Sequence, residues 1–333
     1  MKFSKKLRTL IVGVLVVAAA GLVAGCGEQK NAGSDDGKKK IGVAQLVEHN
    51  ALNAANKGFI DGLKERGYEV DKNIIVDQQN AQADQSNLQN IAQRFVSNKV
   101  DLILAIATPT AQTMANATKD IPILGTAITD YEGAKLVKSD EKPGTNVTGT
   151  SDMNPIKEQI DLLLEICPQA KTIGTIYCSS EVNSEVQVKK MREYAESRGL
   201  KVEVATISTV NDIQQAAQSL VNKVDVFYEP TDNIIASAIP TLTSITDAAK
   251  KPVIVGEPNM VKAGALATYG IDYYKLGVQT GHMAADILDG KVKAADMPIE
   301  LAKDLRVTIN AKNAALLGIS IPAKVMKDAE VVE

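Results

Sequence analysis

Residues 101–128 read DLILAIATPTAQTMANATKDIPILGTAI, and this stretch decides the fold class. An apolar run of strand length (101–107) is followed by a helical pattern (109–120) and by a second apolar run (121–128). Continuous apolar strands joined by helices are typical of parallel sheets that are covered on both faces. The stretch therefore predicts one strand–helix–strand unit of an α/β protein.

The same alternation continues in both directions along the chain. Further apolar runs of strand length lie at 41–47, 73–79, 171–178, 201–207, 224–229 and 251–257. The polar segment GTNVTGTS (144–151) divides them into two series, and we expect it to be the first crossing between two lobes. A long helical pattern (273–290) and a last strand pattern (299–309) indicate two further crossings. The sequence predicts an α/β fold of two doubly wound parallel-sheet lobes joined by a three-strand hinge.

The length of the chain supports this division. About 290 residues follow the N-terminal segment, which is too many for one comfortable core and suits two domains. The expected lobe 1 comprises 41–147 plus 271–298, and the expected lobe 2 comprises 148–270 plus 299–333.

Residues 1–26 predict a lipoprotein signal peptide. The first ten residues, MKFSKKLRTL, carry four cations and no acid, and the apolar run IVGVLVVAAAGLVAG follows them. Small residues directly before Cys26 resemble the lipobox at which bacterial signal peptidase cleaves, so Cys26 is the expected lipidation site. A retained membrane anchor is the alternative, and either interpretation places the protein on the outer face of the cell membrane. Residues 27–40 lack large apolar side chains and predict a flexible tether.

Charge and cysteine content exclude several classes of site. Removal of the four signal-peptide cations takes the formal charge from −3 to −7, and no cluster of Lys and Arg offers a surface for nucleic acid. Cys167 precedes a strand pattern that ends in Cys178, and the two ends of such a strand lie about 20 Å apart. Disulfide-bonded Cα atoms lie within about 7 Å of each other, so two free thiols are predicted. With only two histidines in the chain, we expect neither a His/Cys metal site nor a cofactor.

Sequence motifs of enzymes are missing or incomplete. Gly144 and Gly149 have the spacing of a phosphate-binding P-loop, but Thr150 stands where that motif requires lysine. No G-x-G-x-x-G fingerprint follows a strand, and no G-x-S-x-G elbow occurs. We therefore expect a binding protein and not an enzyme.

Polar residues cluster where the strands of lobe 1 are expected to end. Ligands of open α/β sheets bind outside the carboxyl ends of the strands, so two facing lobes share one cleft. Thr108 suits the N-cap of the following helix, which would direct the amides of Thr110 and Ala111 into the cleft. Helix N-termini bind anions, so a ligand carboxylate is expected there. Glu48 and His49 crowd the end of the first strand and are further candidates, although a lone histidine in such a loop is usually structural.

The matching strand ends of lobe 2 supply acids, amides and hydroxyls. Asp232, in VFYEPTDN (226–233), is the first choice for the partner of a ligand ammonium group, and Glu181 is the second. Capping of the helix that starts near Ile234 explains Asp232 equally well, and the two roles can coexist. The other candidate ligand contacts at these junctions, each with a structural alternative, are Ser179, Asn183, Ser184 and Glu257.

Longer stretches of the chain carry a family resemblance. IGVAQLVEHNALNAANKGFIDGLKERGY (41–68), followed in order by AIATPTAQ, NVTGTSD, GTIYCSSEVNS, EPTDN and GALATYGIDYYKLG, resembles the substrate-binding lipoproteins of bacterial ABC importers. The resemblance covers essentially the whole mature chain. Members of this family are similar to type I periplasmic binding proteins, and several are linked to uptake of tryptophan, tyrosine or phenylalanine. The resemblance implies a cleft that binds the α-amino and α-carboxyl groups of an amino acid, with an apolar pocket for the side chain.

Residues and resemblance together predict a lipid-anchored, monomeric, extracytoplasmic receptor. It is expected to capture an amino acid, most simply an aromatic one, to close by hinge rotation and to deliver its ligand to the permease and ATPase subunits of an importer. A sugar or nucleoside receptor on the same fold is the first alternative. An α/β enzyme such as a glycosyltransferase or an epimerase is the second.

Overall fold

The computed structural model describes residues 37–333. The predicted signal peptide, the lipidation site Cys26 and most of the predicted tether lie outside the described residues. The first described strand, β1 (Lys39–Gln45), begins before residue 41, so the last two residues of the predicted tether belong to the fold. No helix in the described part of the chain is long and apolar enough to cross a bilayer.

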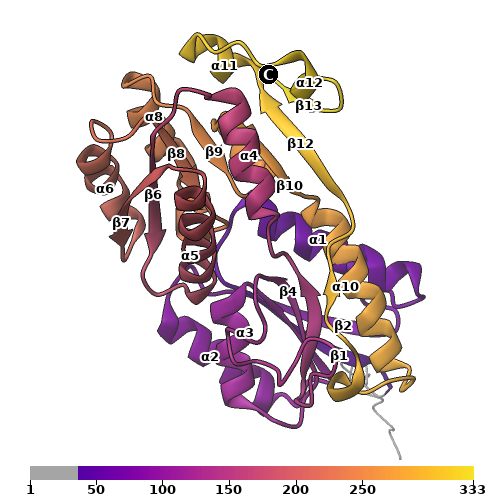
Figure 1. Ribbon diagram of the computed structural model, residues 1–333. Coiled ribbons are helices and arrows are strands. Elements are labelled where there is room, and N and C mark those ends of the chain that lie inside the picture. The colour runs from indigo at the N-terminus through magenta and orange to yellow at the C-terminus, as the bar shows by residue number, and fades with distance from the viewer. Residues whose placement is uncertain (1–36) are drawn as a thin grey trace, which may run out of the picture. The chain divides into compact units, whose positions relative to one another are not determined.

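Two sheets divide residues 37–333 into two lobes (Figure 1). The strands of lobe 1 are β1, β2 (Ile74–Asn80), β3 (Leu102–Ile106), β4 (Ile123–Ile128), β5 (Val147–Ser151) and β11 (Glu300–Leu301). The strands of lobe 2 are β6 (Thr172–Cys178), β7 (Lys201–Ile207), β8 (Val226–Glu229), β9 (Val253–Val255), β10 (Ala267–Ile271), β12 (Leu305–Asn310) and β13 (Glu330–Val332). Their orders are β11-β5-β4-β3-β1-β2 and β13-β12-β10-β9-β8-β6-β7. All neighbours pair in parallel except β10 and β12, which confirms the predicted α/β fold.

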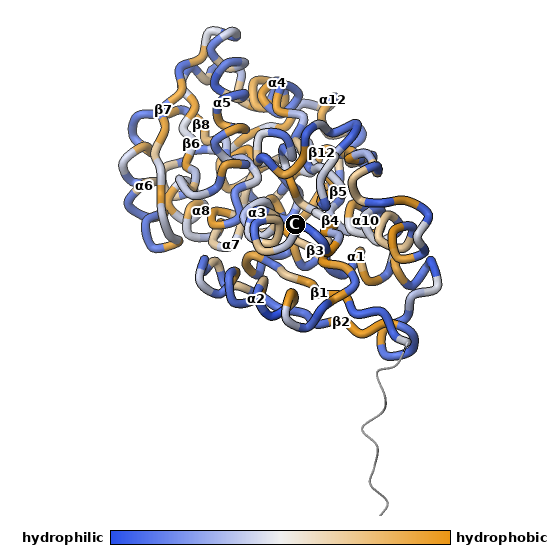
Figure 2. Tube along the Cα trace, turned by 90° about the horizontal axis from the view of Figure 1, so that it is seen from below, coloured by the Kyte–Doolittle hydropathy of each residue, from blue (hydrophilic) through white to orange (hydrophobic). Residues whose placement is uncertain are grey.

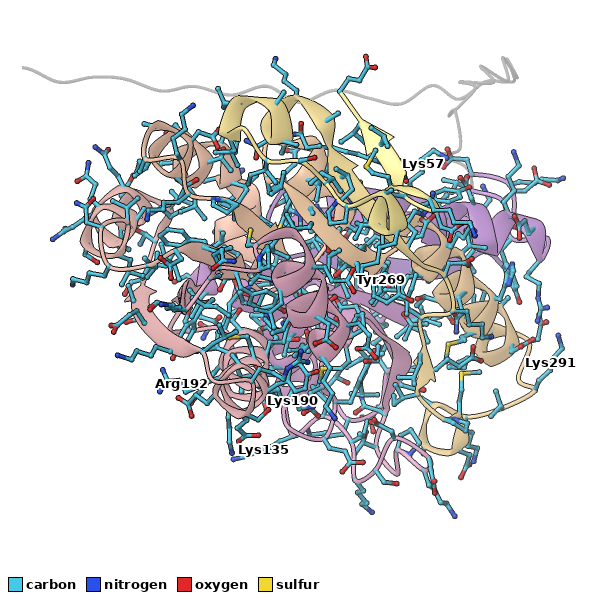
Figure 3. The ribbon with its side chains drawn as sticks, turned by 45° about the horizontal axis from the view of Figure 1, so that its top comes forward. Lys57, Lys135, Lys190, Arg192, Tyr269 and Lys291 are labelled. Carbon is cyan, nitrogen blue, oxygen red and sulfur yellow. The ribbon has the colours of Figure 1, made fainter. Side chains whose placement is uncertain are left out.

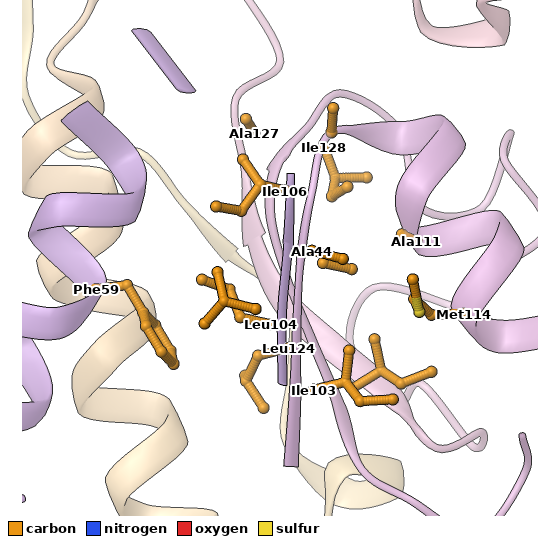
Figure 4. Packing of buried hydrophobic residues seen from close by; sticks show 14 of the residues in the cluster. Ala44, Phe59, Ile103, Leu104, Ile106, Ala111, Met114, Leu124, Ala127 and Ile128 are labelled. Carbon is orange, nitrogen blue, oxygen red and sulfur yellow. The ribbon is translucent and has the colours of Figure 1, made fainter. Parts of the chain in front are cut away.

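Helices cover both faces of these sheets. Lobe 1 holds α1 (Asn50–Glu65), α2 (Gln85–Ser97), α3 (Thr108–Ala117), α10 (Tyr273–Leu288) and the short η2 (Ala294–Asp296). Lobe 2 holds α4 (Ile156–Ile166), α5 (Val182–Ser197), η1 (Val210–Asp212), α6 (Ile213–Leu220), α7 (Asn233–Ser237), α8 (Ile239–Ala248), α9 (Pro258–Lys262), α11 (Ala311–Leu317) and α12 (Ala323–Met326). Figure 4 shows Phe59 of α1 on one face of the first sheet and Met114 of α3 on the other.

The strands are apolar because both of their faces are buried. Every residue of β3 and β4 is buried, as expected for the middle of a parallel sheet between two layers of helices. In Figure 2 the hydrophobic segments run through the middle of the lobes and the hydrophilic segments lie at the periphery. Both predicted thiols, Cys167 and Cys178, are free.

Within residues 37–333 the chain passes between the lobes three times. The crossings are 152–155 between β5 and α4, Asp272 between β10 and α10, and 302–304 between β11 and β12. The prediction that 144–151 is itself a crossing is wrong, because β5 and β11 pair with each other inside the first sheet. Small residues made this strand hard to recognise. Gly149 has φ 142°, and a side chain there would lie 2.0 Å from the Gly125 carbonyl oxygen, so this position of β5 requires glycine.

The helix α10 returns to lobe 1 and lies directly on α1. A methyl group on Gly277 would be 2.0 Å from the carbonyl oxygen of Ala55, and one on Gly58 would be 2.0 Å from that of Tyr274. Gly62 and Gly281 continue the contact, with similar close approaches to the facing backbone. The two helices therefore touch backbone to backbone, and only glycine fits at the crossing.

Candidate functional site

A closed cavity lies between the lobes, at the carboxyl ends of the strands. Its volume is only about 10 Å³. That is room for about one water molecule. Across the cavity, His49 Nε2 lies 3.2 Å from Asn233 Oδ1, which links the two lobes by a hydrogen bond. The lobes are therefore closed on each other, and a ligand can enter only when they separate.

The wall of lobe 1 presents the N-terminus of α1. This side is lined by His49, Ala51, Leu52, Ala127 and Thr129. His49 occupies the N-cap position but its side chain does not cap the helix, and the first turn contains no acid. The first amides of α1 are therefore without an intrahelical partner beside the cavity, where they and the helix dipole favour an anion. Glu48, a predicted contact, is exposed and lies outside the cavity wall.

The predicted anion site at α3 is displaced from this cavity. The N-cap of α3 is Ala107, which has φ 82° and ψ 151°, so the predicted capping role of Thr108 is wrong. The physical reason is the backbone at Ala107, which turns directly after β3 in a conformation that local sequence did not indicate. Thr108, Thr110 and Ala111 are buried in lobe 1, and none of the three lines the cavity.

Asp232 serves as a structural acceptor in the wall of lobe 2. Its Oδ1 accepts from the Ile235 amide at 2.9 Å and so caps α7. Its Oδ2 accepts from the Cys178 amide at 2.7 Å and from the Ser184 hydroxyl at 2.8 Å. Burial raises the pKa of Asp232, and these hydrogen bonds oppose that shift. The capping alternative is confirmed, although the carboxylate also borders the cavity.

A gap in the second sheet explains why Asp232 is needed there. Strands β6 and β8 pair at only two positions, Ile173 with Val226 and Gly174 with Phe227, and then diverge. In the gap, Glu229 Oε2 accepts from the amide of Ile176 at 3.0 Å, two residues before the amide that Asp232 accepts. The two side-chain carboxyl groups thus replace the missing strand partner of β6.

Glu181 lies behind the cavity wall and holds two amide side chains in place. Its Oε2 accepts from Asn183 Nδ2 at 2.9 Å and from Asn233 Nδ2 at 2.6 Å. Burial, and secondarily the charge of Asp232, raise the pKa of Glu181 to about 8. Asn183 also donates to the Thr231 carbonyl at 3.2 Å, so its Nδ2 is fixed. Its buried Oδ1 has no partner, and Asn183 lines the cavity with this unused acceptor.

Three other predicted contacts have structural partners of their own. Glu257 lines the cavity and caps α9 through the Asn259 and Met260 amides, and burial raises its pKa to about 7. The Ser184 hydroxyl donates to Asp232, and Ser184 does not line the cavity. Ser179 is exposed and its hydroxyl donates to the Ile207 carbonyl.

Sequence reasoning missed several residues of the cavity wall. They are Thr129, Asp152, Thr231, Asn233 and Tyr273. Two of them mark strand ends: Thr129 directly follows β4, and Asp152 directly follows β5. The strand-end rule would have selected Asp152 if β5 had been recognised as a strand. Tyr273 is the first residue of α10, and nothing in its local sequence distinguishes it from a core tyrosine.

The site is acidic and has no cationic side chain to balance it. Within residues 37–333 five acids are buried, of which Asp152, Asp232 and Glu257 line the cavity. The other two are Glu181 and Glu229. Among the described residues no Lys or Arg is buried, and Figure 3 shows Lys135, Arg192 and Lys291 pointing away from the protein. Burial lowers the pKa of His49 to about 4, and the hydrogen bond to Asn233 opposes this only in part, so the imidazole is neutral at pH 7.

An acidic wall that faces a free helix N-terminus suits a ligand with one positive and one negative group. Carboxylates attract an ammonium group, and the amides of α1 attract a carboxylate. Within residues 37–333, no group of three or more His, Cys, Asp or Glu side chains could hold a metal ion.

Comparisons with known proteins identify the family. A family model described as ABC transporter substrate binding protein matches residues 40–333. The tyrosine-binding protein of Clostridioides difficile is 46% identical over 316 residues, which cover 92% of this chain and 90% of that protein. The crystal structure of the ABC domain in complex with L-Trp from Streptococcus pneumonia is 44% identical, with a TM-score of 0.86 over 89% of this chain and 100% of that one.

A third relative is known without ligand. The ligand-free, open structure of a substrate binding protein with adhesive properties from Clostridium difficile is 47% identical. Its TM-score is 0.69 over 89% of this chain and 99% of that one. The chain therefore belongs to the ABC transporter substrate-binding proteins and has the fold of the type I periplasmic binding proteins.

Proposed function

We propose that the protein is an extracytoplasmic receptor, anchored by lipid on Cys26, that captures an aromatic amino acid and delivers it to the permease of an ABC importer. The observation that carries the proposal is the acidic wall of lobe 2 opposite the uncapped N-terminus of α1. Relatives at more than 40% identity are named for tyrosine or hold L-Trp, which supports an aromatic side chain.

The cavity wall offers a partner for each part of such a ligand. The α-carboxylate would lie at the α1 amides near Ala51 and Leu52, and the α-ammonium would lie at the carboxylates. The side chain would lie against Ala127 and Ala236 of the cavity wall. Asn183 Oδ1 supplies one more acceptor. Among the contacts predicted from the sequence, we retain His49, Asn183, Asp232 and Glu257.

Lobe closure supports the receptor role. At similar sequence identity, the protein superposes better on the relative with bound L-Trp than on the ligand-free, open one, with TM-scores of 0.86 and 0.69. The hydrogen bond between His49 and Asn233 joins the lobes in this closed form. Ligand would favour closure because only the closed form brings both walls to it.

A ligand screen tests the function. The chain without residues 1–26 would be examined by native mass spectrometry as purified, and then by thermal shift with the twenty amino acids, common sugars and nucleosides. We expect stabilisation by Trp, Tyr or Phe, equivalent to about 2.7 kcal/mol at a ligand concentration of 100 times Kd. Stabilisation by sugars or nucleosides alone would leave a solute receptor of this fold but contradict the amino-acid assignment.

Ligand affinity is expected to fall in acid because of His49. Its pKa is about 4 in the closed form, and opening would return it toward the ordinary value near 6.5. Between pH 6.5 and 4, His49 binds a proton in the open form but not in the closed form. Closure is therefore favoured above pH 6.5 and is lost progressively as the pH falls toward 4. Calorimetry should show affinity about 30-fold weaker at pH 5 than at pH 7.5 from this residue alone.

The control for this experiment is His49→Gln, which removes the titrating ring. Other buried acids titrate in the same range, so the quantity to compare is the difference between the two proteins. The same loss of affinity in His49→Gln would show that other groups cause the pH dependence.

A further inference from the structure

Asp152 occupies a place that no other acid of the site shares. It directly follows β5 and is the first residue of the first crossing between the lobes. The side chain is buried, with 3% exposure, and the residue lines the cavity. Its own amide donates to the Ile128 carbonyl at 3.0 Å, which fixes the backbone at the end of β4.

The carboxylate of Asp152 has acceptor capacity to spare. Oδ1 accepts from the Thr129 hydroxyl at 3.2 Å, and Oδ2 accepts from the Tyr273 hydroxyl at 2.5 Å. A carboxylate has about four acceptor positions, so about two remain. Both partners are neutral, and the charge of Asp152 therefore has no counter-ion among the described side chains.

The other acids of the cavity wall are more fully used. Asp232 accepts three hydrogen bonds, two of them from backbone amides, and its removal would open the gap beside β6. Glu257 accepts three hydrogen bonds, from the Asn259 amide and side chain and from the Met260 amide. An uncompensated buried carboxylate is unfavourable unless a cation joins it. Burial raises the pKa of Asp152, and the hydrogen bonds from Tyr273 and Thr129 oppose this shift only in part.

The hinge gives Asp152 a second distinction. Tyr273, its partner, directly follows the second crossing at Asp272, so their hydrogen bond ties two crossings together. Groups at the crossings stay close to each other while the lobes rotate about them. Asn183 and Asp232, in contrast, lie on lobe 2 and meet the wall of lobe 1 only on closure.

We propose that Asp152 is the primary partner of the ligand's ammonium group and holds the ligand at the hinge before the lobes close. Thr129 and Tyr273 are positioning residues that orient its carboxylate. Asp232 and Asn183 would reach the ligand second, as lobe 2 swings in. This inference rests on the proposed function, because it requires a ligand with an amino group.

The test compares Asp152→Asn with Asp232→Asn, two variants that each remove one carboxylate charge. Each protein is titrated with L-tryptophan and L-tyrosine and with their deaminated analogues, indole-3-propionate and 3-(4-hydroxyphenyl)propionate. We expect Asp152→Asn to weaken binding of the amino acids about 100-fold, to lower their association rate, and to leave the analogues nearly unchanged. Asp232→Asn should keep a preference for the amino acids and act mainly on the dissociation rate.

Tyr273→Phe keeps the carboxylate and removes only one of its hydrogen-bond donors. It should weaken amino-acid binding about tenfold with little effect on the analogues, and it remains informative if Asp152→Asn fails to fold. The inference would be overturned, and the proposed function kept, by one pair of results. Asp152→Asn would keep the wild-type preference for ligands with an amino group, and Asp232→Asn would lose it. A wild-type protein that binds neither amino acid would overturn the proposed function as well.

Discussion

Gly277→Ala is expected to destabilise the protein by about 3 kcal/mol or more, although it adds a single methyl group. The methyl carbon would lie 2.0 Å from the Ala55 carbonyl oxygen, and that atom belongs to the backbone of α1. A flexible side chain could move aside, but here two whole helices must separate. Their separation would weaken the packing of Phe59 and of other apolar residues around the crossing.

Urea denaturation followed by circular dichroism measures this effect. Lys64→Ala is a suitable control, because Lys64 is exposed on the same α1 helix and should change the free energy of unfolding by no more than about 0.5 kcal/mol. If Gly277→Ala unfolded at the wild-type urea concentration, the backbone contact between α1 and α10 would be refuted.

Asp232→Ala is expected to reduce the free energy of unfolding by about 2 to 5 kcal/mol. The substitution removes the N-cap of α7 and leaves the buried Cys178 and Ile235 amides without their acceptor. The loss of stability is large because buried amides without a hydrogen-bond acceptor are unfavourable. Asp232→Asn keeps one carbonyl acceptor and should fall between Asp232→Ala and the wild type in the same urea experiment.

The outcome also separates the two roles that the sequence allows for Asp232, helix capping and ligand binding. A variant that is as stable as the wild type but has lost its ligand would make Asp232 a ligand contact without a structural role. A destabilised variant that still prefers amino acids to their deaminated analogues would make Asp232 chiefly a structural residue, as its contacts in the gap beside β6 indicate.

The fold was largely predictable because apolar runs and helical patterns alternate so regularly. The exception is β5, where VTGTS is polar yet buried at every position. Its threonines find partners far away in sequence, since Thr148 donates to the Met297 carbonyl and Thr150 pairs with Thr280. Local hydropathy does not indicate such partners, so the sequence alone predicts a crossing between lobes here.

The candidate site was predictable only in outline. The strand-end rule located the correct edge of both sheets, but capping signals drew attention to α3, whose Thr-Pro start resembles an N-cap. The helix that faces the cavity is α1, and its signal is the lack of a capping side chain at His49. The positive φ of Ala107, at the N-cap of α3, has no marker in the sequence.

The contact between α1 and α10 also governs when lobe 1 can be finished. A growing chain that ends near residue 150 would contain the glycine face of α1 but not the helix that covers it, because α10 is formed by Tyr273–Leu288. The strand β11, at Glu300–Leu301, arrives later still. Although N-terminal domains generally fold first during synthesis, this lobe cannot complete its core until nearly the entire polypeptide has emerged. Until then lobe 1 is incompletely folded. A chain that is threaded through a secretion channel must be in such an unfolded state.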